Sequence, residues 1–373
     1  MSGILFVSSH NTGHGHKSIT EALCTHIHRM EPGVEIKDVD GFILSGKINS
    51  FMSKLYDRFV VNVPLIWKYY YQLGNIFPGV ANTYMTKNIR GSLIELIEQE
   101  NPELIVAVHP CFVSPVKDVL EYMGRNIPVV SLVADLDNVS RMWADKRIDC
   151  TICPTEKARS SMVKYGVPAE KAVITGFPIR DRFNHYQPVT SLTYYNRIKQ
   201  KGRLNFLLMN GSQGKGIVTH FAKELLENFD CKVVILAGNN IRFKEAAQNA
   251  LRHYGDRVEV CGFINNVEQY MSEADILILR ASPNVLMEAV NLCKPVIITG
   301  ALTGQEEKNP EYAVNNNLGV ICKKAGNLAD TIKKLLADEG RLLNEIYLSQ
   351  INYRNTGAAE NIAEILLGLL KGK

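Results

Sequence analysis

The sequence predicts an α/β protein made of two doubly wound domains, each built on a parallel sheet. Its 373 residues exceed what one hydrophobic core usually fills, and they suit two domains of roughly 150–200 residues each. Short apolar runs alternate with amphipathic segments along the chain, which is typical of parallel strands joined by crossover helices. This alternation stops in the polar stretch 182–203, which indicates a break between the domains.

Each half of the chain contains six short apolar runs that we expect to form strands. In the first half they are residues 4–8, 34–39, 104–108, 129–133, 150–153 and 172–175. In the second half they are residues 206–209, 233–236, 258–261, 276–279, 296–298 and 319–322. Helices should fill the intervals, as in the segment that begins near His16, where Ile19, Leu23 and Ile27 recur at helical spacing.

We place the domain boundary near Val189, inside the polar stretch. The first domain then covers residues 1–188 and the second covers residues 189–355. The last segment, 356–373, contains an amphipathic helix that can pack back across either domain, and the first domain is the expected one.

Composition excludes several classes of protein. A hydrophobic fraction of 46% and a charged fraction of 21% are those of a globular chain, and no apolar run approaches the length of a membrane span. The N-terminus runs directly into a strand, which is unlike a signal peptide. The net charge of +4 comes from dispersed basic residues, so no nucleic-acid partner is expected. Eight scattered cysteines are typical of free thiols in a reducing compartment, and the Cys150/Cys153 pair reads as buried strand.

The segment 51–77 combines aromatic rings with apolar and basic residues. Tyr56, Trp67 and Tyr70 are among its rings. Aromatic side chains with polar tips beside lysines are typical of a contact with a membrane interface. The alternative is an ordinary helical hairpin packed on the core.

Three loops follow predicted strands and open predicted helices, which is where α/β domains bind ligands. The first ends at His16, which can act as a general base or serve only the local structure. The second contains Gly211, Ser212, Gln213 and Gly214, a set of small residues whose N–H groups suit a phosphate, although the spacing is not that of a Walker loop. The third starts at Ser282 and carries Glu288 in its helix, where a carboxylate can bind ribose hydroxyls.

These loops and four motifs resemble the family of monogalactosyldiacylglycerol synthases and bacterial processive diacylglycerol glucosyltransferases, relatives of the peptidoglycan-building N-acetylglucosaminyltransferase. The text at 12–17 is similar to the family's TGGGH turn, and VADL at 133–136 with Trp143 is similar to its mid-domain signature. TGFPIR at 175–180 matches TGxPxR, and LTGQEEKN at 302–309 is similar to LPGQEEGN. The resemblance covers nearly the whole chain and implies the GT-B fold, with two Rossmann-like domains facing across a cleft.

The resemblance implies an inverting transfer of a hexose from UDP-glucose or UDP-galactose to diacylglycerol or a related glycolipid. In this reading the first domain binds the acceptor and the second binds the UDP-sugar. No cofactor and no metal are expected, because loop amides and helix N-termini neutralise the leaving diphosphate. The enzyme would act in the cytoplasm, as a peripheral protein on the inner face of the cell membrane.

The resemblance also implies roles for single residues. His16 is the first candidate for the general base, since an ordinary imidazole pKa near 6.5 suits proton removal at neutral pH, and Asp135 is the rival. The implied donor-binding residues are Gly211, Ser212, Gln213, Gly214, Phe263, Ser282, Asn284, Val285, Glu288, Gln305 and Glu306. The implied acceptor-binding or membrane-contacting residues are Tyr56, Trp67, Tyr70, His109 and Trp143.

Two departures keep other functions open. His14 stands where the family has glycine, and Ser282-Pro283-Asn284-Val285 stands where it has GPGT. The second change costs backbone flexibility beside the diphosphate. A regulator that binds UDP-sugar without turning it over is therefore one alternative. A UDP-sugar 2-epimerase of the same fold is another, although such enzymes lack the aromatic segment and the GQEExN motif.

Overall fold

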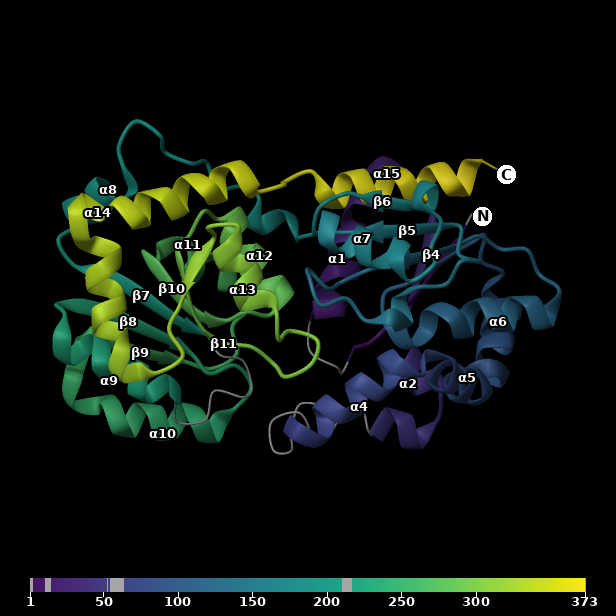
Figure 1. Cartoon of the computed structure of the whole chain (residues 1–373), viewed down its shortest axis with the longest axis horizontal. Helices are drawn as coiled ribbons and strands as arrows, with labels where there is room; N and C mark the ends of the chain where they lie inside the picture. Colours follow the sequence, from purple (N-terminus) through teal and green to yellow (C-terminus); the bar gives the residue numbers. More distant parts are fainter. Residues whose placement is uncertain (1–2, 11–14, 52, 54–63, 210–216, 373) are drawn as a thin grey trace. The chain divides into compact units, whose positions relative to one another are not determined.

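The computed structural model describes residues 3–10, 15–51, 53, 64–209 and 217–372, apart from the side chains of residues 64, 65, 67 and 70. The chain forms two compact units. Unit 1 comprises Met1–Arg180, Leu302–Glu307 and Asn355–Lys373. Unit 2 comprises Asp181–Ala301 and Lys308–Arg354. Each unit has its own sheet with its own helices (Figure 1).

The sheet of unit 1 has the strand order β2-β1-β3-β4-β5-β6, and all of its neighbouring strands are parallel. Its strands are β1 (Gly3–Ser8), β2 (Glu35–Asp40), β3 (Leu104–Ala107), β4 (Val129–Leu132), β5 (Cys150–Cys153) and β6 (Ala172–Ile174). All four residues of β3, β4 and β5 are buried, which explains why their sequences are apolar apart from Ser131 and Thr151. The Cys150/Cys153 pair is therefore buried strand, as expected.

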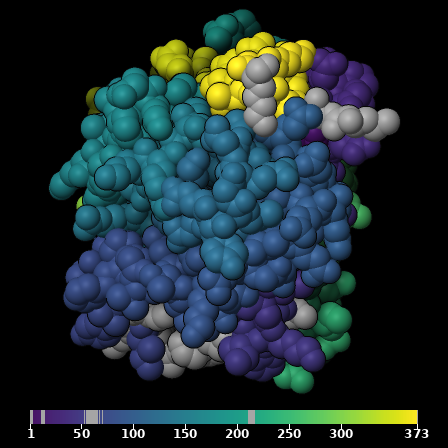
Figure 2. Space-filling view, turned by 90° about the vertical axis from the view of Figure 1, so that its right-hand side faces the viewer, coloured from purple at the N-terminus to yellow at the C-terminus, as the bar shows by residue number. Residues whose placement is uncertain are grey.

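Helices cover both faces of this sheet. They are α1 (Gly15–Met30), α2 (Gly41–Leu44), α4 (Pro64–Ile76), α5 (Pro78–Glu100), η1 (Pro110–Phe112), α6 (Val113–Met123), η2 (Arg141–Trp143), α7 (Glu156–Lys164), η3 (Ala169–Lys171) and α15 (Ala358–Lys371). Figure 1 shows α15 on one side of the sheet and α5 with α6 on the other. In Figure 2 the yellow α15 lies beside purple N-terminal residues, in agreement with its packing on α1. The C-terminal helix thus packs back on the first sheet of the chain.

Unit 2 repeats the arrangement with the strand order β12-β11-β10-β7-β8-β9, again all parallel. Its strands are β7 (Leu204–Met209), β8 (Cys231–Leu236), β9 (Val258–Cys261), β10 (Ile276–Arg280), β11 (Val296–Gly300) and β12 (Gly319–Ile321). Its helices are η4 (Asp181–Phe183), α8 (Tyr194–Gln200), α9 (Ile217–Asn228), α10 (Ile241–Leu251), η6 (Arg252–Arg257), α11 (Val267–Glu273), α12 (Pro283–Asn291), α13 (Asn309–Asn315), η7 (Ala325–Asn327) and α14 (Leu328–Tyr353).

The predicted α/β class is confirmed. Every apolar run that we expected to be a strand is one, with ends that differ by one or two residues. The expected domain boundary near Val189 differs from the division of the chain after Arg180. The reason is a set of hydrogen bonds within unit 2: the N–H of Val189 donates to Tyr347 Oη at 3.0 Å, and that hydroxyl donates to the carbonyl of Val189 at 3.2 Å. The polar stretch is therefore part of unit 2.

Among the described residues, no helix is both long enough and apolar enough to cross a membrane.

Candidate active site

In unit 1 the strand order changes direction beside β1, which has β2 on one side and β3 on the other. Loops that leave the carboxyl ends of such neighbouring strands diverge, and the space between them is where doubly wound sheets bind ligands. The segment after β1 leads to His16 in the first turn of α1, and the residue that precedes η1 after β3 is His109. The strand order therefore brings His16 and His109, two predicted site residues, to the same edge of the sheet.

Two further predicted residues join these histidines. The ring centroid of His16 lies 4.9 Å from that of His109 and 6.5 Å from that of Trp143. The indole Nε1–H of Trp143 donates to Asp135 Oδ2 at 2.7 Å. We call His16, His109, Asp135 and Trp143 the catalytic cluster. The fold thus brings His16, His109 and the pair of Asp135 and Trp143 from three parts of the sequence into one group within unit 1.

Burial changes the proton affinity of both histidines. It lowers the pKa of His16 to about 4, against a smaller opposing effect of a hydrogen bond to the carbonyl of Val108. His16 Nδ1 is buried and has no hydrogen-bond partner among the described residues. The pKa of His109 is also lowered, by burial first and by the neighbouring His16 second. The expectation of an ordinary imidazole pKa for His16 is wrong, and the ring is neutral at pH 7.

Asp135 shows the opposite shift. Burial raises its pKa to about 6, and the charge of Glu306 adds to this effect. Hydrogen bonds from Trp143 and from the backbone of Ser140 oppose the rise by stabilising the carboxylate. A pKa of about 6 leaves the carboxylate of Asp135 mostly ionised at pH 7, and the residue is partly exposed.

The predicted sugar-binding residues Gln305 and Glu306 lie in the segment Leu302–Glu307, which belongs to unit 1 by its contacts. Glu306 is buried, and its Oε2 accepts the N–H of Leu302 at 2.9 Å. The carbonyl of Gly304 accepts the side-chain amide of Asn138 at 2.6 Å. This segment therefore lies beside the loop that carries Asp135.

In unit 2 the strand order changes direction between β7 and β10. The residues that follow β10 open α12, which begins at Pro283 with Ser282 as its N-cap. The Ser282 side chain makes no capping hydrogen bond, so it does not bind the backbone N–H groups in the first turn of α12. Glu288 lies one turn further along α12 and is 5% exposed. Asn284 and Val285 are partly exposed at the start of the helix.

A cavity of about 510 Å³ opens at the carboxyl ends of β8 and β9. It is lined by Gly238, Asn239, Ile241, Lys244, Glu245, Gln248, Gly262 and Phe263. Phe263, predicted to meet the uracil base, is 60% exposed at its rim. A Cβ atom at position 262 would lie 3.7 Å from Cδ of Lys244, so the absence of a side chain on Gly262 leaves space beside the Lys244 stem. The sequence did not single out Lys244 or its neighbours on α10. Gly238 and Gly262, which closely follow β8 and β9, were a signal that a ligand could bind there.

Some predicted residues lie outside the described part of the chain. They are Tyr56, Gly211, Ser212, Gln213 and Gly214, together with the side chains of Trp67 and Tyr70.

Comparison with known proteins agrees with this geometry. Residues 16–179 match the family model of monogalactosyldiacylglycerol (MGDG) synthase, and residues 213–338 match that of glycosyl transferases group 1. The protein is therefore an enzyme of the glycosyltransferase class. The resemblance found in the sequence is confirmed: the chain carries an MGDG synthase domain followed by a group 1 glycosyltransferase domain.

Curated relatives align over almost the whole chain. The processive diacylglycerol beta-glucosyltransferase of Bacillus subtilis (strain 168) is 25% identical over 97% of this chain and 93% of its own length. That of Bacillus cereus (strain AH187) is 26% identical over 98% of this chain and 93% of its own length.

Solved structures share the fold. The S. aureus MnaA–UDP co-structure has a TM-score of 0.65 at 16% identity and covers 99% of this chain and 97% of its own. Acinetobacter baumannii MurG has a TM-score of 0.62 at 13% identity and covers 98% of this chain and 99% of its own. The GT-B fold expected from the sequence is confirmed.

Proposed function

We propose that the protein transfers a hexose from a UDP-sugar to diacylglycerol, or to a glycolipid built on it, with inversion at the anomeric carbon. The observation that carries the proposal is the catalytic cluster. It sets a reachable carboxylate with a pKa of about 6 beside a neutral imidazole, which suits removal of a proton from an alcohol. The names of the Bacillus relatives support a diacylglycerol acceptor.

In the proposed reaction the acceptor oxygen attacks the anomeric carbon while the bond from that carbon to the diphosphate oxygen breaks. UDP departs, and the proton of the acceptor hydroxyl passes to Asp135. We assign the base to Asp135 because its pKa of about 6 makes its carboxylate a stronger base than an imidazole with a pKa of about 4. His16 is proposed to shape the site around that hydroxyl through its contact with Trp143. This reverses the order of the two candidates expected from the sequence.

The donor is proposed to bind unit 2. Its uracil would lie in the cavity beside Phe263, where Lys244 can donate to a base carbonyl. Glu288 would accept hydrogen bonds from ribose hydroxyls. The start of α12 would bind the diphosphate, together with Gly211, Ser212, Gln213 and Gly214. Gln305 and Glu306 would contact the hexose. The MnaA structure, which shares the fold and contains UDP, supports UDP as a part of the ligand.

We propose that no metal or other cofactor takes part. The positive end of α12 and the amides of the loop after β7 supply the charge that stabilises the leaving diphosphate.

A membrane contact is proposed for helices α4 and α5. Seven apolar side chains of α4, α5 and the residue between them are each more than half exposed: Ile66, Tyr69, Leu73, Ile76, Phe77, Val80 and Tyr84. We call them the apolar face. Large exposed apolar surfaces mark partners or membranes, and a diacylglycerol acceptor resides in a bilayer. The proposed location is therefore cytoplasmic, on the inner face of the cell membrane.

One experiment separates this function from its alternatives. The protein is incubated with UDP-glucose, UDP-galactose or UDP-N-acetylglucosamine, with and without vesicles that contain diacylglycerol, and all nucleotides are analysed by chromatography. A transferase releases UDP only when the lipid is present. An epimerase converts the UDP-N-acetylglucosamine without lipid, and a regulator binds UDP by calorimetry but changes no sugar nucleotide. Either of the last two results would overturn the proposal.

A further inference from the structure

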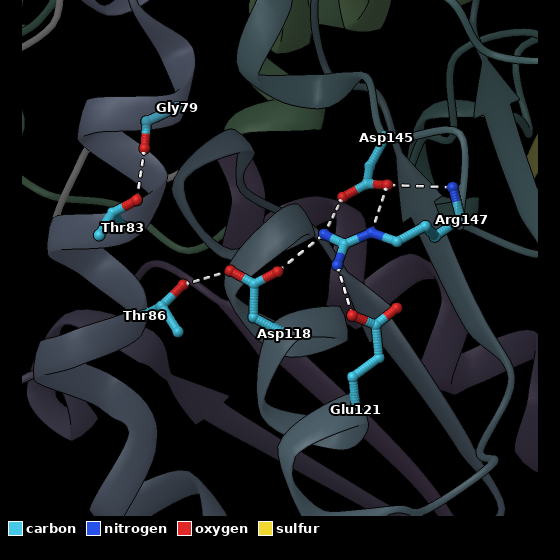
Figure 3. Close-up of polar contacts among 7 residues, drawn as sticks. All are labelled: Gly79, Thr83, Thr86, Asp118, Glu121, Asp145 and Arg147. Atoms are coloured by element: carbon cyan, nitrogen blue, oxygen red, sulfur yellow. Dashed lines mark hydrogen bonds and ion pairs between the residues drawn. The ribbon is translucent and has the colours of Figure 1, made fainter.

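An arginine in unit 1 joins three carboxylates near the catalytic cluster. Figure 3 shows Arg147 at the centre of this group. Its Nε and Nη2 donate to the two oxygens of Asp145 at 3.0 and 2.6 Å, and its Nη2 and Nη1 donate to Asp118 and Glu121 at 2.8 and 2.7 Å. Asp118 in turn accepts the hydroxyl of Thr86 at 2.7 Å. The group therefore joins the segment after η2 to α6 and, through Thr86, to α5.

The same segment carries the indole that binds Asp135. Trp143 is the last residue of η2, two positions before Asp145. Its fully buried ring donates to Asp135, and its carbonyl accepts the hydroxyl of Ser131 on β4 at 3.2 Å. At the other end of η2, Asn75 Oδ1 accepts both the hydroxyl of Ser140 and the N–H of Arg141 at 2.8 Å. The segment 140–147 is thus fixed at both ends.

We propose that Arg147 is a positioning residue: it holds the segment 140–147 on α6 so that the indole N–H of Trp143 stays on the carboxylate of Asp135. Without the guanidinium, Asp118, Glu121 and Asp145 repel one another and the segment loses its ion pairs with α6. The planar guanidinium of Arg147 donates to both oxygens of Asp145 at once, whereas a lysine ammonium cannot bind both oxygens in the same way. The proposal rests on the role given to Asp135 in the proposed function.

The protonation of Asp135 reports whether the indole is in place. A hydrogen bond to a carboxylate favours its ionised form, so loss of the Trp143 donor raises the pKa of Asp135. Other charged or titratable groups near Asp135 are Glu306, whose charge raises its pKa, and His16, which titrates at about 4. Asp137 in the same loop is paired with Lys157 of α7 at 2.9 Å. A titration near pH 6 is therefore distinct from that of His16.

The test uses the fluorescence of Trp143 in the full chain. The sequence has two tryptophans, so Trp67→Phe leaves Trp143 as the single reporter. Its emission is titrated with pH, and the step that disappears in Asp135→Asn is assigned to Asp135. Arg147→Met should raise the midpoint of this step by roughly one pH unit, the size expected when a charged group loses a hydrogen bond. Arg147→Lys keeps the charge but not the fork, and should produce at least half of that rise.

Arg159→Met is the matched control. Arg159 is 33% exposed against 31% for Arg147, pairs with Glu156, and donates to the carbonyl of Ala172 without touching segment 140–147. This control should leave the Asp135 midpoint unchanged even if it lowers the melting temperature. An unchanged midpoint in Arg147→Met would overturn the proposal. So would a midpoint in Arg147→Lys equal to that of the parent, since charge alone would then explain the effect.

A second arm uses turnover. Trp143→Phe and Arg147→Met should shift the acid limb of the kcat/KM profile upward by the same amount, and the double variant should shift it no further. Additive shifts would contradict the proposed route through Trp143. A protein that never transfers sugar would remove the proposed function, while the fluorescence arm would still decide the role of Arg147.

Discussion

At the scale of single residues, both candidate bases are unprotonated at pH 7, for different reasons. The imidazole of His16 is neutral because burial lowers its pKa to about 4. Asp135 is ionised because burial raises its pKa only to about 6 while Trp143 stabilises the carboxylate. A base is most effective when its pKa lies near the working pH, which favours Asp135.

The pH dependence of turnover should therefore follow Asp135. Because the ionised form is the active one, kcat/KM should fall about tenfold per pH unit below about pH 6. Asp135→Asn should lower turnover by about 10²–10⁴-fold, the usual contribution of a general base. His16→Ala should cost less and keep the same acid limb. An acid limb near pH 4 that persists in Asp135→Asn would return the role of base to His16.

Glu288 offers a second test at this scale. It is nearly inaccessible on α12, and a ribose hydroxyl bound to its carboxylate would be a charged hydrogen bond. Glu288→Ala should weaken UDP binding by about 1–3 kcal/mol, measured by calorimetry. Glu288→Gln preserves the packing and should lose part of that affinity. Unchanged affinity for UDP in both variants would remove Glu288 from the ribose site.

At the scale of elements, the apolar face of α4 and α5 should carry the membrane contact. Tyr69, Leu73 and Phe77 are 67%, 55% and 58% exposed, so replacing all three by serine removes apolar contact without opening the core. We expect this variant to co-sediment with anionic vesicles at least about tenfold less than the parent, because each large side chain contributes on the order of 1.5 kcal/mol when buried. Its affinity for UDP should not change.

The matched control replaces Tyr122 and Leu348, which are 68% and 52% exposed on α6 and α14. Serine at these two positions should leave sedimentation as it is. Equal sedimentation of the parent and the Tyr69/Leu73/Phe77 variant would show that the apolar face serves another purpose.

The elements were the part of the fold that the sequence predicted best. A continuous apolar run such as that of β3 is typical of a buried parallel strand. The sequence predicted which loop residues belong to the site. The strand order then places His16 and His109 together, where the sheet of unit 1 changes direction beside β1. The pKa of His16 was out of reach, because the rings that bury it come from distant segments. The cavity beside Phe263 could not be predicted either, because one of its walls is formed by α10, and Lys244 on that helix is part of no recognisable sequence motif.

At the scale of the whole molecule, stability should depend on pH through Lys294. This buried side chain donates to the carbonyls of Ser272 and Ala274, and burial lowers its pKa to about 7. Above pH 7 the folded state has lost a proton that the unfolded state keeps up to about pH 10. Stability from this group therefore rises with pH, by at most about 1.4 kcal/mol per pH unit.

Lys294→Met should remove this rise. The free energy of unfolding of unit 2, measured with urea between pH 6.5 and 8.5, should increase in the parent relative to the variant as the pH increases. The comparison of two proteins cancels the titrations that they share. A difference between them that does not vary with pH would show that Lys294 stays protonated in the folded state.

The most direct test of the central claim is the structure of the reaction product. The protein is supplied with UDP-glucose labelled with ¹³C and with vesicles that contain diacylglycerol, and the extracted lipid is examined by NMR. We expect a glucose joined to the free hydroxyl of diacylglycerol in the β configuration, inverted from the α linkage of the donor, and its near absence with Asp135→Asn. An α-linked glycolipid, or a labelled sugar that never leaves UDP while UDP still binds, would contradict this expectation.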